Sequence, residues 1–418
     1  MKIDLKALAD SVKGLADVCT RCGMCQAVCP VYRNTLVESD SARGKLTLLS
    51  ALHEELTSSP KETLKRLERC TLCGGCQTTC PRGVSTVDAF LLARKALHEA
   101  GALSGTKRTL LRQAFADPER TATLAARFAW VQRFFTKTED PDARIALKKS
   151  YPVPKVVRPF LKDRGLNPQE SQAGDGPKVL LFSGCLVDKV YPFVGEGLVG
   201  LLTEAGVRVE IPEGQGCCGI PLLSGGDVEA FADVVRSHLS LFGGEDFDFI
   251  VTPCATCTHA LKELWLKAEG LDDSERKSLE GIASKVMDGS QLLASLGDTP
   301  EEGDVEEESL VVTVHDPCHS RHSLKNTRHV RELVKQAGHT LVEMEAGCCG
   351  LGGSFGVSHR SLSLEIGATC LQRMEATGAD VVVTTCPGCM AQIEALLTAS
   401  GSSMKVRHAV ELFGDEMA

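Results

Sequence analysis

The sequence lacks any long hydrophobic run. Its most apolar stretches, such as 310–314 and 381–385, have the length of single strands, whereas a membrane span needs about 18 consecutive apolar residues. No apolar segment of the signal-peptide type follows Met1 and Lys2. These absences predict a cytoplasmic protein that does not cross a bilayer.

Excess positive charge is also missing. The 418-residue chain has a formal net charge of −9 at pH 7 and so lacks the basic footprint of nucleic-acid-binding proteins. It contains no P-loop, no Gly-x-Ser-x-Gly motif and no His-Glu-x-x-His motif. A Gly-x-Gly-x-x-Gly match at Gly195 starts about a dozen residues after its strand, too far for a dinucleotide fingerprint. We therefore expect no nucleic-acid partner, no bound flavin and no catalytic residue on this chain.

Cysteine, by contrast, is abundant, with 19 in the chain. Secreted disulfide scaffolds are short, whereas a reducing cytoplasm uses patterned cysteines for metal binding or redox chemistry. All but one of these cysteines fall into four patterned groups. The remaining one, Cys370, lies in a predicted helix over 362–376, where a buried and inert thiol is expected.

Two cysteine runs near the N-terminus have the form Cys-x-x-Cys-x-x-Cys-x-x-x-Cys-Pro. This is the spacing of bacterial ferredoxins, whereas zinc sites prefer two separated Cys-x-x-Cys pairs. In two-cluster ferredoxins the fourth cysteine of each run serves the other cluster. The predicted ligands of one cubane [4Fe–4S] cluster are Cys19, Cys22, Cys25 and Cys80, and those of the second are Cys70, Cys73, Cys76 and Cys29.

The segment between the two runs predicts helices over 45–55 and 63–69, with four leucines at helical spacing: Leu46, Leu49, Leu52 and Leu56. We therefore expect a helical ferredoxin domain over 1–100. A helical connector with a proline-rich linker follows over 101–176. Its amphipathic basic segment around 124–135 either packs on the two domains or offers a surface to a partner subunit or anionic lipid.

Two five-cysteine frames fill the rest of the chain. They consist of Cys185, Cys217, Cys218, Cys254 and Cys257, and of Cys318, Cys348, Cys349, Cys386 and Cys389. Matching members stand at a nearly constant offset, which predicts two homologous metal-binding pockets. Adjacent cysteines cannot easily chelate one metal, but they can reach two irons of an opened cluster. Thiol exchange and zinc binding remain the alternatives.

Strands and helices alternate around these frames. Strands are predicted over 179–183, 207–211 and 249–252, and again over 310–315, 340–344 and 380–384, with a helix such as 227–242 between them. This alternation indicates parallel sheets whose carboxyl ends carry the cysteines. The predicted fold class is α+β multidomain, with a helical ferredoxin domain followed by two tandem α/β cysteine-rich repeats. The repeats span 177–297 and 309–418, and an acidic linker over 298–308 joins them.

Three histidines accompany the second frame: His315, His319 and His322. An imidazole near a cluster could tune it or carry a proton. Packing and backbone capping are the alternative interpretation.

Taken together, these motifs resemble the iron–sulfur subunit of glycolate oxidase and of related membrane-associated lactate dehydrogenases. The resemblance covers nearly the whole chain and includes 41–45 (Ser-Ala-Arg-Gly-Lys) and 348–355 (Cys-Cys-Gly-Leu-Gly-Gly-Ser-Phe). It implies that a separate flavin subunit oxidises a 2-hydroxy acid. Electrons would then pass through two cubane clusters and one or two further clusters in the cysteine-rich repeats, towards quinone or another carrier. It also implies that the chain is inactive alone and lies in the cytoplasm or on the inner face of the membrane.

Other families share parts of this pattern. The catalytic subunit of heterodisulfide reductase has the same domain order, and its five-cysteine frames hold non-cubane [4Fe–4S] clusters that cleave a disulfide. Both frames are complete here, so this function stays open. The related subunit of anaerobic glycerol-3-phosphate dehydrogenase generally lacks the Arg-Gly-Lys stretch. A redox scaffold that only docks two partners is the third possibility.

Overall fold

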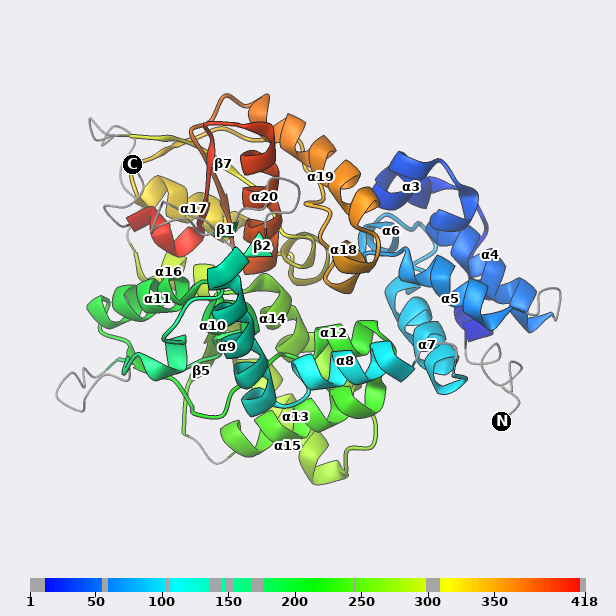
Figure 1. The fold of residues 1–418 in the computed structure, drawn as a ribbon, viewed down its shortest axis with the longest axis horizontal. Coiled ribbons are helices and arrows are strands. Elements are labelled where there is room, and N and C mark those ends of the chain that lie inside the picture. The colour runs from blue at the N-terminus through cyan, green and yellow to red at the C-terminus, as the bar shows by residue number, and fades with distance from the viewer. Residues whose placement is uncertain are drawn as a thin grey trace.

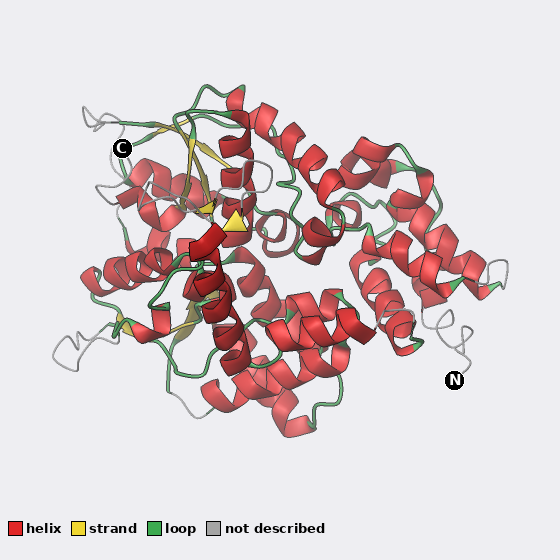
Figure 2. Ribbon diagram, in the orientation of Figure 1, coloured by secondary structure: helices red, strands yellow, loops and turns green. Residues whose placement is uncertain are grey.

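The computed structural model describes residues 12–54, 59–101, 105–135, 145–146, 153–166, 176–243, 246–297 and 309–413. A helical N-terminal part lies beside two units that combine helices with strands (Figure 1). Figure 2 shows that the strands belong to the later part of the chain, as the sequence predicts. The predicted acidic linker over 298–308 lies outside the described residues, as do parts of the predicted connector.

The N-terminal part contains only helices and turns among its described residues up to position 101. They are α2 (Met24–Val28), α3 (Pro30–Thr35), the 3-10 turn η1 (Glu38–Asp40), α4 (Ala42–His53), α5 (Pro60–Glu68), α6 (Gly75–Thr78) and α7 (Thr86–Glu99). Helices α4 and α5 are the two that the sequence predicts between the cysteine runs. Leu46, Leu49 and Leu52 are buried in a core shared with α5 and α7, whereas Leu56 lies outside the described residues.

The connector begins with α8 (Gly105–Phe115) and α9 (Pro118–Phe135), and a short antiparallel pair, β1 (Ile145–Ala146) and β2 (Val153–Pro154), follows. Arg112 on α8 holds the carboxylate of Asp227 in the first repeat, with nitrogen–oxygen distances of 2.6 and 2.7 Å. On α9, Leu124 and Phe128 are 41% and 47% exposed. The predicted amphipathic helix therefore exists, and part of its apolar face is not buried by the described residues.

Each repeat contains a four-stranded parallel sheet. The first has the order β4 (Arg208–Glu210), β3 (Lys178–Leu181), β5 (Phe249–Thr252), β6 (Val286–Asp288), and the second has the order β8 (Thr340–Leu341), β7 (Val311–Val314), β9 (Val381–Thr384), β10 (Lys405–His408). The two orders correspond strand for strand, which confirms the predicted internal repeat. The fourth strand of each sheet escaped sequence analysis. β6 is only three residues long, and β10 alternates basic and apolar residues.

Helices connect the strands in the same sequence in both units. The first repeat has α10 (Gly184–Lys189), α11 (Pro192–Glu204), α12 (Ile220–Ser224), α13 (Val228–Phe242), α14 (Ala255–His259), the π-helix η4 (Ala260–Leu264), the 3-10 turn η5 (Trp265–Lys267), α15 (Asp273–Lys285) and α16 (Gly289–Leu296). The second has the π-helix η6 (His319–Leu324), α17 (Arg328–Gln336), α18 (Ser354–Ser358), α19 (Arg360–Glu375), α20 (Pro387–Ser400) and the 3-10 helix η7 (Ala409–Phe413), while a 3-10 turn η2 (Leu161–Asp163) precedes both.

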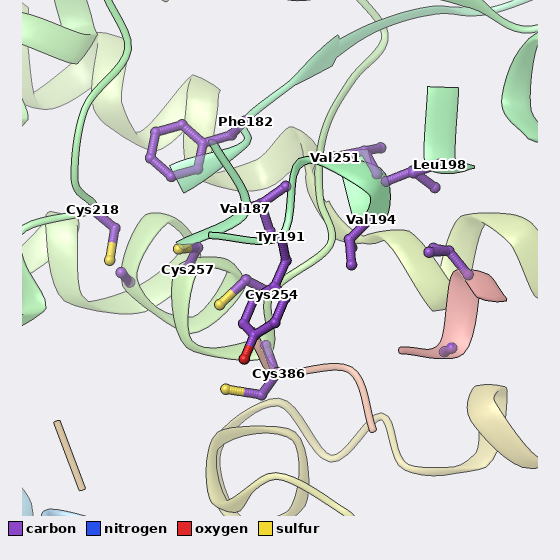
Figure 3. Packing of buried hydrophobic residues seen from close by; sticks show 14 of the residues in the cluster. Phe182, Val187, Tyr191, Val194, Leu198, Cys218, Val251, Cys254, Cys257 and Cys386 are labelled. Atoms are coloured by element: carbon purple, nitrogen blue, oxygen red, sulfur yellow. The ribbon is translucent and has the colours of Figure 1, made fainter. Parts of the chain in front are cut away.

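The carboxyl ends of the two sheets meet. The loop after β5 donates a backbone hydrogen bond from Ala255 to the carbonyl of Thr385 in the loop after β9, at 3.0 Å. The ring of His408, at the end of β10, lies 2.9 Å from the carbonyl of Pro253. One apolar core therefore runs through both repeats, and Figure 3 shows cysteines from both within it.

Gly44 explains why glycine stands in the Ser-Ala-Arg-Gly-Lys stretch. Ser41 caps α4 by accepting a hydrogen bond from the Gly44 amide at 3.0 Å. A β-carbon on residue 44 would lie 1.9 Å from the backbone oxygen of Glu38. The turn η1 and the start of α4 thus pack backbone against backbone, and no side chain fits between them.

We predict that Gly44→Ala destabilises the protein by about 1–3 kcal/mol, because its methyl group would overpack against backbone that no rotamer change can move. The midpoint of denaturant unfolding, followed by circular dichroism, measures this loss. Gly14→Ala is the matched control. Gly14 is an exposed helical residue, and a β-carbon there would meet nothing within 4 Å, so alanine should stabilise by about 1 kcal/mol. Equal midpoints for the two variants would contradict this account.

Candidate metal centres

The first cysteine group surrounds a cavity of about 390 Å³. Its lining includes Cys19, Cys22 and Cys25 from the first run and Cys80 from the second. Burial raises the pKa of the Cys25 thiol, and a hydrogen bond from the Arg43 backbone opposes that rise. The structure therefore brings together the four residues predicted as ligands of one cubane cluster.

The second group surrounds a neighbouring cavity of about 400 Å³. It is lined by Cys70, Cys73 and Cys76 of the second run and by Cys29 of the first. The amide of Tyr32 donates to the Cys29 sulfur at 3.4 Å. Burial raises the pKa of Cys29 to about 11, and the nearby charges of Cys70 and Cys73 add to the effect. Cys29 thus lies with the other run, as the predicted exchange of fourth ligands requires.

Helix α4 places one cation beside each of these two groups. Arg43 lines the first cavity, where it donates to the carbonyl of Arg21 at 3.1 Å. Lys45 lines the second cavity and is 1% exposed. Burial lowers the pKa of Lys45, whereas the thiolates of Cys70 and Cys29 oppose that shift. The Arg-Gly-Lys stretch therefore sets two positive charges against two groups of thiolates.

All ten frame cysteines line one larger cavity of about 1150 Å³. This differs from the expected two separate pockets, because the loops at the carboxyl ends of β5 and β9 pack against each other. Figure 3 shows the sulfur of Cys386, from the second repeat, near those of Cys218, Cys254 and Cys257 from the first. Cys254 and Cys386 are hydrogen-bonded to each other across the repeats.

One cysteine pair recurs in both repeats. The second member of the vicinal pair faces the last member of the Cys-x-x-Cys pair. Cys349 and Cys389 have their sulfurs 3.3 Å apart, and Cys218 is hydrogen-bonded to Cys257 in the same relation. The two frames therefore present the same local donor arrangement, and the repeat extends from sequence to site.

The vicinal cysteines of the first repeat have different partners. Cys217 hydrogen-bonds Cys185 as well as Cys218, which raises the pKa of Cys217 and lowers the pKa values of both partners. Cys218 in turn reaches Cys257. Adjacent thiols aimed at separate partners suit a centre that contains more than one metal ion. Buried soft sulfur donors of this kind fit iron–sulfur clusters.

The glycine after each vicinal pair is required by the following helix. Gly219 and Gly350 have φ values of 85° and 89°. A β-carbon on Gly350 would lie 2.2 Å from the carbonyl oxygen of Ser363 on α19, and one on Gly219 would lie 2.7 Å from the ring of Phe231 on α13. Close packing of these helices, together with the left-handed backbone, holds each vicinal pair at the cavity wall.

The three histidines of the second frame have distinct partners. The Nδ1 atom of His319 lies 3.0 Å from the Thr256 hydroxyl, and burial lowers its pKa to about 4. His322 contacts the hydroxyl of Thr78 in the N-terminal part at 3.0 Å. A ring nitrogen of His315 lies within 4.8 Å of the sulfurs of Cys349 and Cys389.

Arg94 is a site residue that sequence analysis missed. It comes from α7, is 3% exposed and lines the large cavity. Its guanidinium donates to the carbonyl of Ser224 in the first repeat at 2.8 Å and to that of Cys70 at 2.9 Å. One arginine in an amphipathic helix carries no sequence signal, yet this residue joins the second cysteine group to the cysteine-rich repeats.

Family comparisons agree with this division of the chain. Residues 15–84 match the 4Fe-4S dicluster domain, and residues 179–262 and 312–394 each match the cysteine-rich domain called CCG. Each match lies within one of the segments predicted as domains. The chain therefore contains a dicluster domain followed by two cysteine-rich repeats, and it is an iron–sulfur protein.

Several named proteins are similar over long stretches. A probable glycolate oxidase iron-sulfur subunit of Bacillus subtilis is 27% identical and covers 93% of this chain and 90% of its own length. A subunit of the fumarate reductase (CoM/CoB) of Methanothermobacter marburgensis is 26% identical over 94% and 71%. Lactate utilization protein A of Shouchella clausii is 31% identical over 57% of this chain and 99% of its own. A glutamate racemase structure from Bacillus anthracis, with a TM-score of 0.24 at 13% identity over 57% of this chain and 78% of its own, carries no argument.

We predict that Cys29→Ser removes the cluster of the second run rather than that of its own run. Cys29→Ser and Cys70→Ser should each lose about four iron atoms per chain. The double variant should lose no more than either single variant, because both residues serve one cluster. Iron and sulfide analysis of anaerobically purified protein measures this.

Cys22→Ser provides the matched control. Combined with Cys29→Ser, it should remove about eight iron atoms, since two clusters are then affected. A loss of only about four in that combination, with about eight in the Cys29 and Cys70 combination, would overturn the exchanged assignment.

Proposed function

Because the chain belongs to the family of iron–sulfur oxidoreductase subunits that includes lactate utilization protein A and the glycolate oxidase iron–sulfur subunit, we propose that it transfers electrons for a 2-hydroxy-acid dehydrogenase. A separate flavin-containing subunit would oxidise glycolate or lactate. This chain would receive the electrons and pass them to quinone or another carrier.

One observation carries the proposal: the cysteine cavities are contiguous. Cys76 lines both the first and the second cavity. Cys70 lines both the second cavity and the large one. Neighbouring groups thus share a wall, and the sequence of cavities runs from the N-terminal part into the repeats. An electron relay needs such closely spaced centres, whereas isolated structural metal sites do not.

We propose two cubane [4Fe–4S] clusters in the N-terminal cavities and one or two further clusters, of the opened non-cubane kind, in the large cavity. When bound, such clusters accept and release single electrons. The chain's own residues hold them, keep water away through burial, and supply the charges of Arg43 and Lys45. Among the described residues no further cavity offers a comparable sulfur-rich lining, and the oxidation of substrate is left to the flavin partner.

The proposed partner surface includes α9. Leu124 and Phe128 remain exposed there, beside the exposed Arg127. None of the helices in the described part of the chain has both the length and the apolar composition of a bilayer span. Contact with a membrane-bound carrier would therefore use such a peripheral surface.

Disulfide reduction is a second candidate, favoured by the large cavity. Both five-cysteine frames are complete, and their sulfurs face one space of about 1150 Å³. That volume exceeds the usual range for small-molecule sites, of about 300–1,000 Å³, so it could hold clusters and a substrate together. In this case the repeats would be the catalytic centre, and the N-terminal clusters would supply it with electrons.

The decisive experiment compares the isolated chain with the purified complex. The complex should oxidise glycolate or lactate with a quinone analogue as acceptor, whereas the isolated chain should not oxidise either acid. The intact chain should contain about 16 iron atoms if all four sites are filled, and about eight if the repeats are empty.

Two results would reject the relay. Hydroxy-acid oxidation by the isolated chain would place the chemistry here. Oxidation of a reduced viologen dye that depends on an added disulfide, without any flavin subunit, would establish the second candidate instead.

A further inference from the structure

The two repeats differ at one position beside otherwise matching sulfurs. Three residues before the first frame cysteine, and directly after a buried strand, the first repeat has Phe182 and the second has His315. Phe182 packs edge-on against His238 and Trp265, with ring centroids 5.3 and 6.2 Å away. An aromatic hydrocarbon there offers no hydrogen bond to sulfur.

His315 occupies the same place with a polar ring. It is 2% exposed, and its backbone amide donates to the carbonyl of Val383 at 2.8 Å, which holds the residue against β9. The ring lies within 4.8 Å of the sulfurs of Cys349 and Cys389. It is hydrogen-bonded to Cys349, the thiol equivalent to Cys218 of the first repeat.

The residue behind the ring also differs between the repeats. In the first repeat, α13 places His238 there, and backbone groups occupy both of its nitrogens. Nδ1 lies 2.8 Å from the Val234 carbonyl, and Nε2 accepts from the Gly216 amide at 3.2 Å. In the second repeat, α19 places Cys370 there, with its sulfur 3.7 Å from Nδ1 of His315. Cys370, the cysteine outside every motif, thus contacts the ring that faces the frame.

We propose that His315, oriented by Cys370, donates a hydrogen bond to the Cys349 sulfur and makes the centre of the second repeat more easily reduced than that of the first. Hydrogen bonds to cluster sulfurs stabilise the more negative, reduced state and so raise the reduction potential. Electrons that enter the large cavity would then collect on the second repeat. This inference rests on the proposed function, because it assumes that clusters fill the frames.

The test is a redox titration of the intact, cluster-loaded chain, followed by EPR. His315→Phe installs the residue of the first repeat. It should shift one signal to a lower potential by about 59 mV, equal to a tenfold change in a one-electron equilibrium. The two N-terminal clusters and the iron content should not change. Cys370→Ala should shift the same signal in the same direction by less.

Two further variants keep the result interpretable. His259→Phe replaces another buried histidine, which stacks on His319 at 4.8 Å, and it should leave all potentials unchanged. His315→Gln retains a nitrogen donor and should keep the potential nearer to that of the wild type than His315→Phe does. An unshifted signal in His315→Phe, or an equal shift of every signal, would overturn the inference alone. Loss of iron from both His315 variants would overturn it in favour of direct ligation. A wild-type chain with clusters only in its N-terminal part would overturn this inference and the clusters proposed for the repeats.

A separate cavity of about 830 Å³ lies between the N-terminal part and the second repeat. Arg33 of α3, Arg321 of η6 and Arg373 of α19 line it from three elements. Its one acidic lining residue, Asp316, is held by Arg331 at 2.9 and 3.0 Å.

The charge of this cavity is unbalanced. Arg373 pairs with Glu345 at 3.0 Å. Arg33 and Arg321 have no acidic partner in the described part of the chain. Two free guanidinium groups in a protein of formal charge −9 form a local site for carboxylate or phosphate groups, which arginine binds through two parallel hydrogen bonds.

We infer that this cavity binds a small organic anion with two acidic groups. Cys73, Cys318 and Cys348 also line it, so the anion would lie beside sulfurs of both the N-terminal part and the second repeat. The volume falls in the range of small-molecule sites. The inference rests on charge and shape and does not require clusters.

Calorimetric titration of the intact chain with malonate and, separately, with pyrophosphate tests this site. Preference for one probe identifies the acidic group as carboxylate or phosphate. Arg33→Gln combined with Arg321→Gln should weaken binding at least tenfold, with an unchanged thermal midpoint. Arg276→Gln, an exposed residue of α15, is the control and should bind as the wild type does. Absence of binding for both probes, or equal weakening in the control, would overturn the inference.

Discussion

The meeting of the two sheets at their carboxyl ends is the constraint on which the site depends. Parallel strands deliver loop residues to one edge of each sheet. The backbone bond from Ala255 to Thr385 joins those edges, so ten cysteines face one space instead of two. The buried Arg94 then ties that space to the N-terminal part through the carbonyls of Cys70 and Ser224. Without these contacts the four cysteine groups would be separate metal sites.

Much of this arrangement follows from local sequence rules. The spacing of the cysteine runs anticipates the grouping of Cys29 with the second run, because the geometry of cubane ligation recurs whenever that spacing occurs. Strand lengths and alternation anticipate the parallel sheets, since buried strands read as short apolar runs between helices. The helices between the two runs follow from leucine periodicity, and the structure places three of those leucines in one core.

Other features depend on tertiary contacts that no local pattern encodes. The single cavity arises where two repeats pack, and each frame alone predicts only its own pocket. Arg94 and Cys370 carry no motif, yet one bridges two parts of the chain and the other contacts the ring of His315. Strands β6 and β10 are short and partly polar, so their pairing depends on neighbours already in place. Internal symmetry also hides asymmetry, because the cysteines match between the repeats whereas Phe182 and His315 do not.

Electron transfer through one connected path is the central claim, and shared walls at Cys76 and Cys70 are its structural basis. The most direct measurement is the EPR spectrum of the fully reduced chain, compared with spectra at partial reduction. Neighbouring paramagnetic clusters broaden and split each other's signals. We predict that every signal in the fully reduced protein carries such coupling. A set of sharp, independent signals, unchanged from partial to full reduction, would contradict the account.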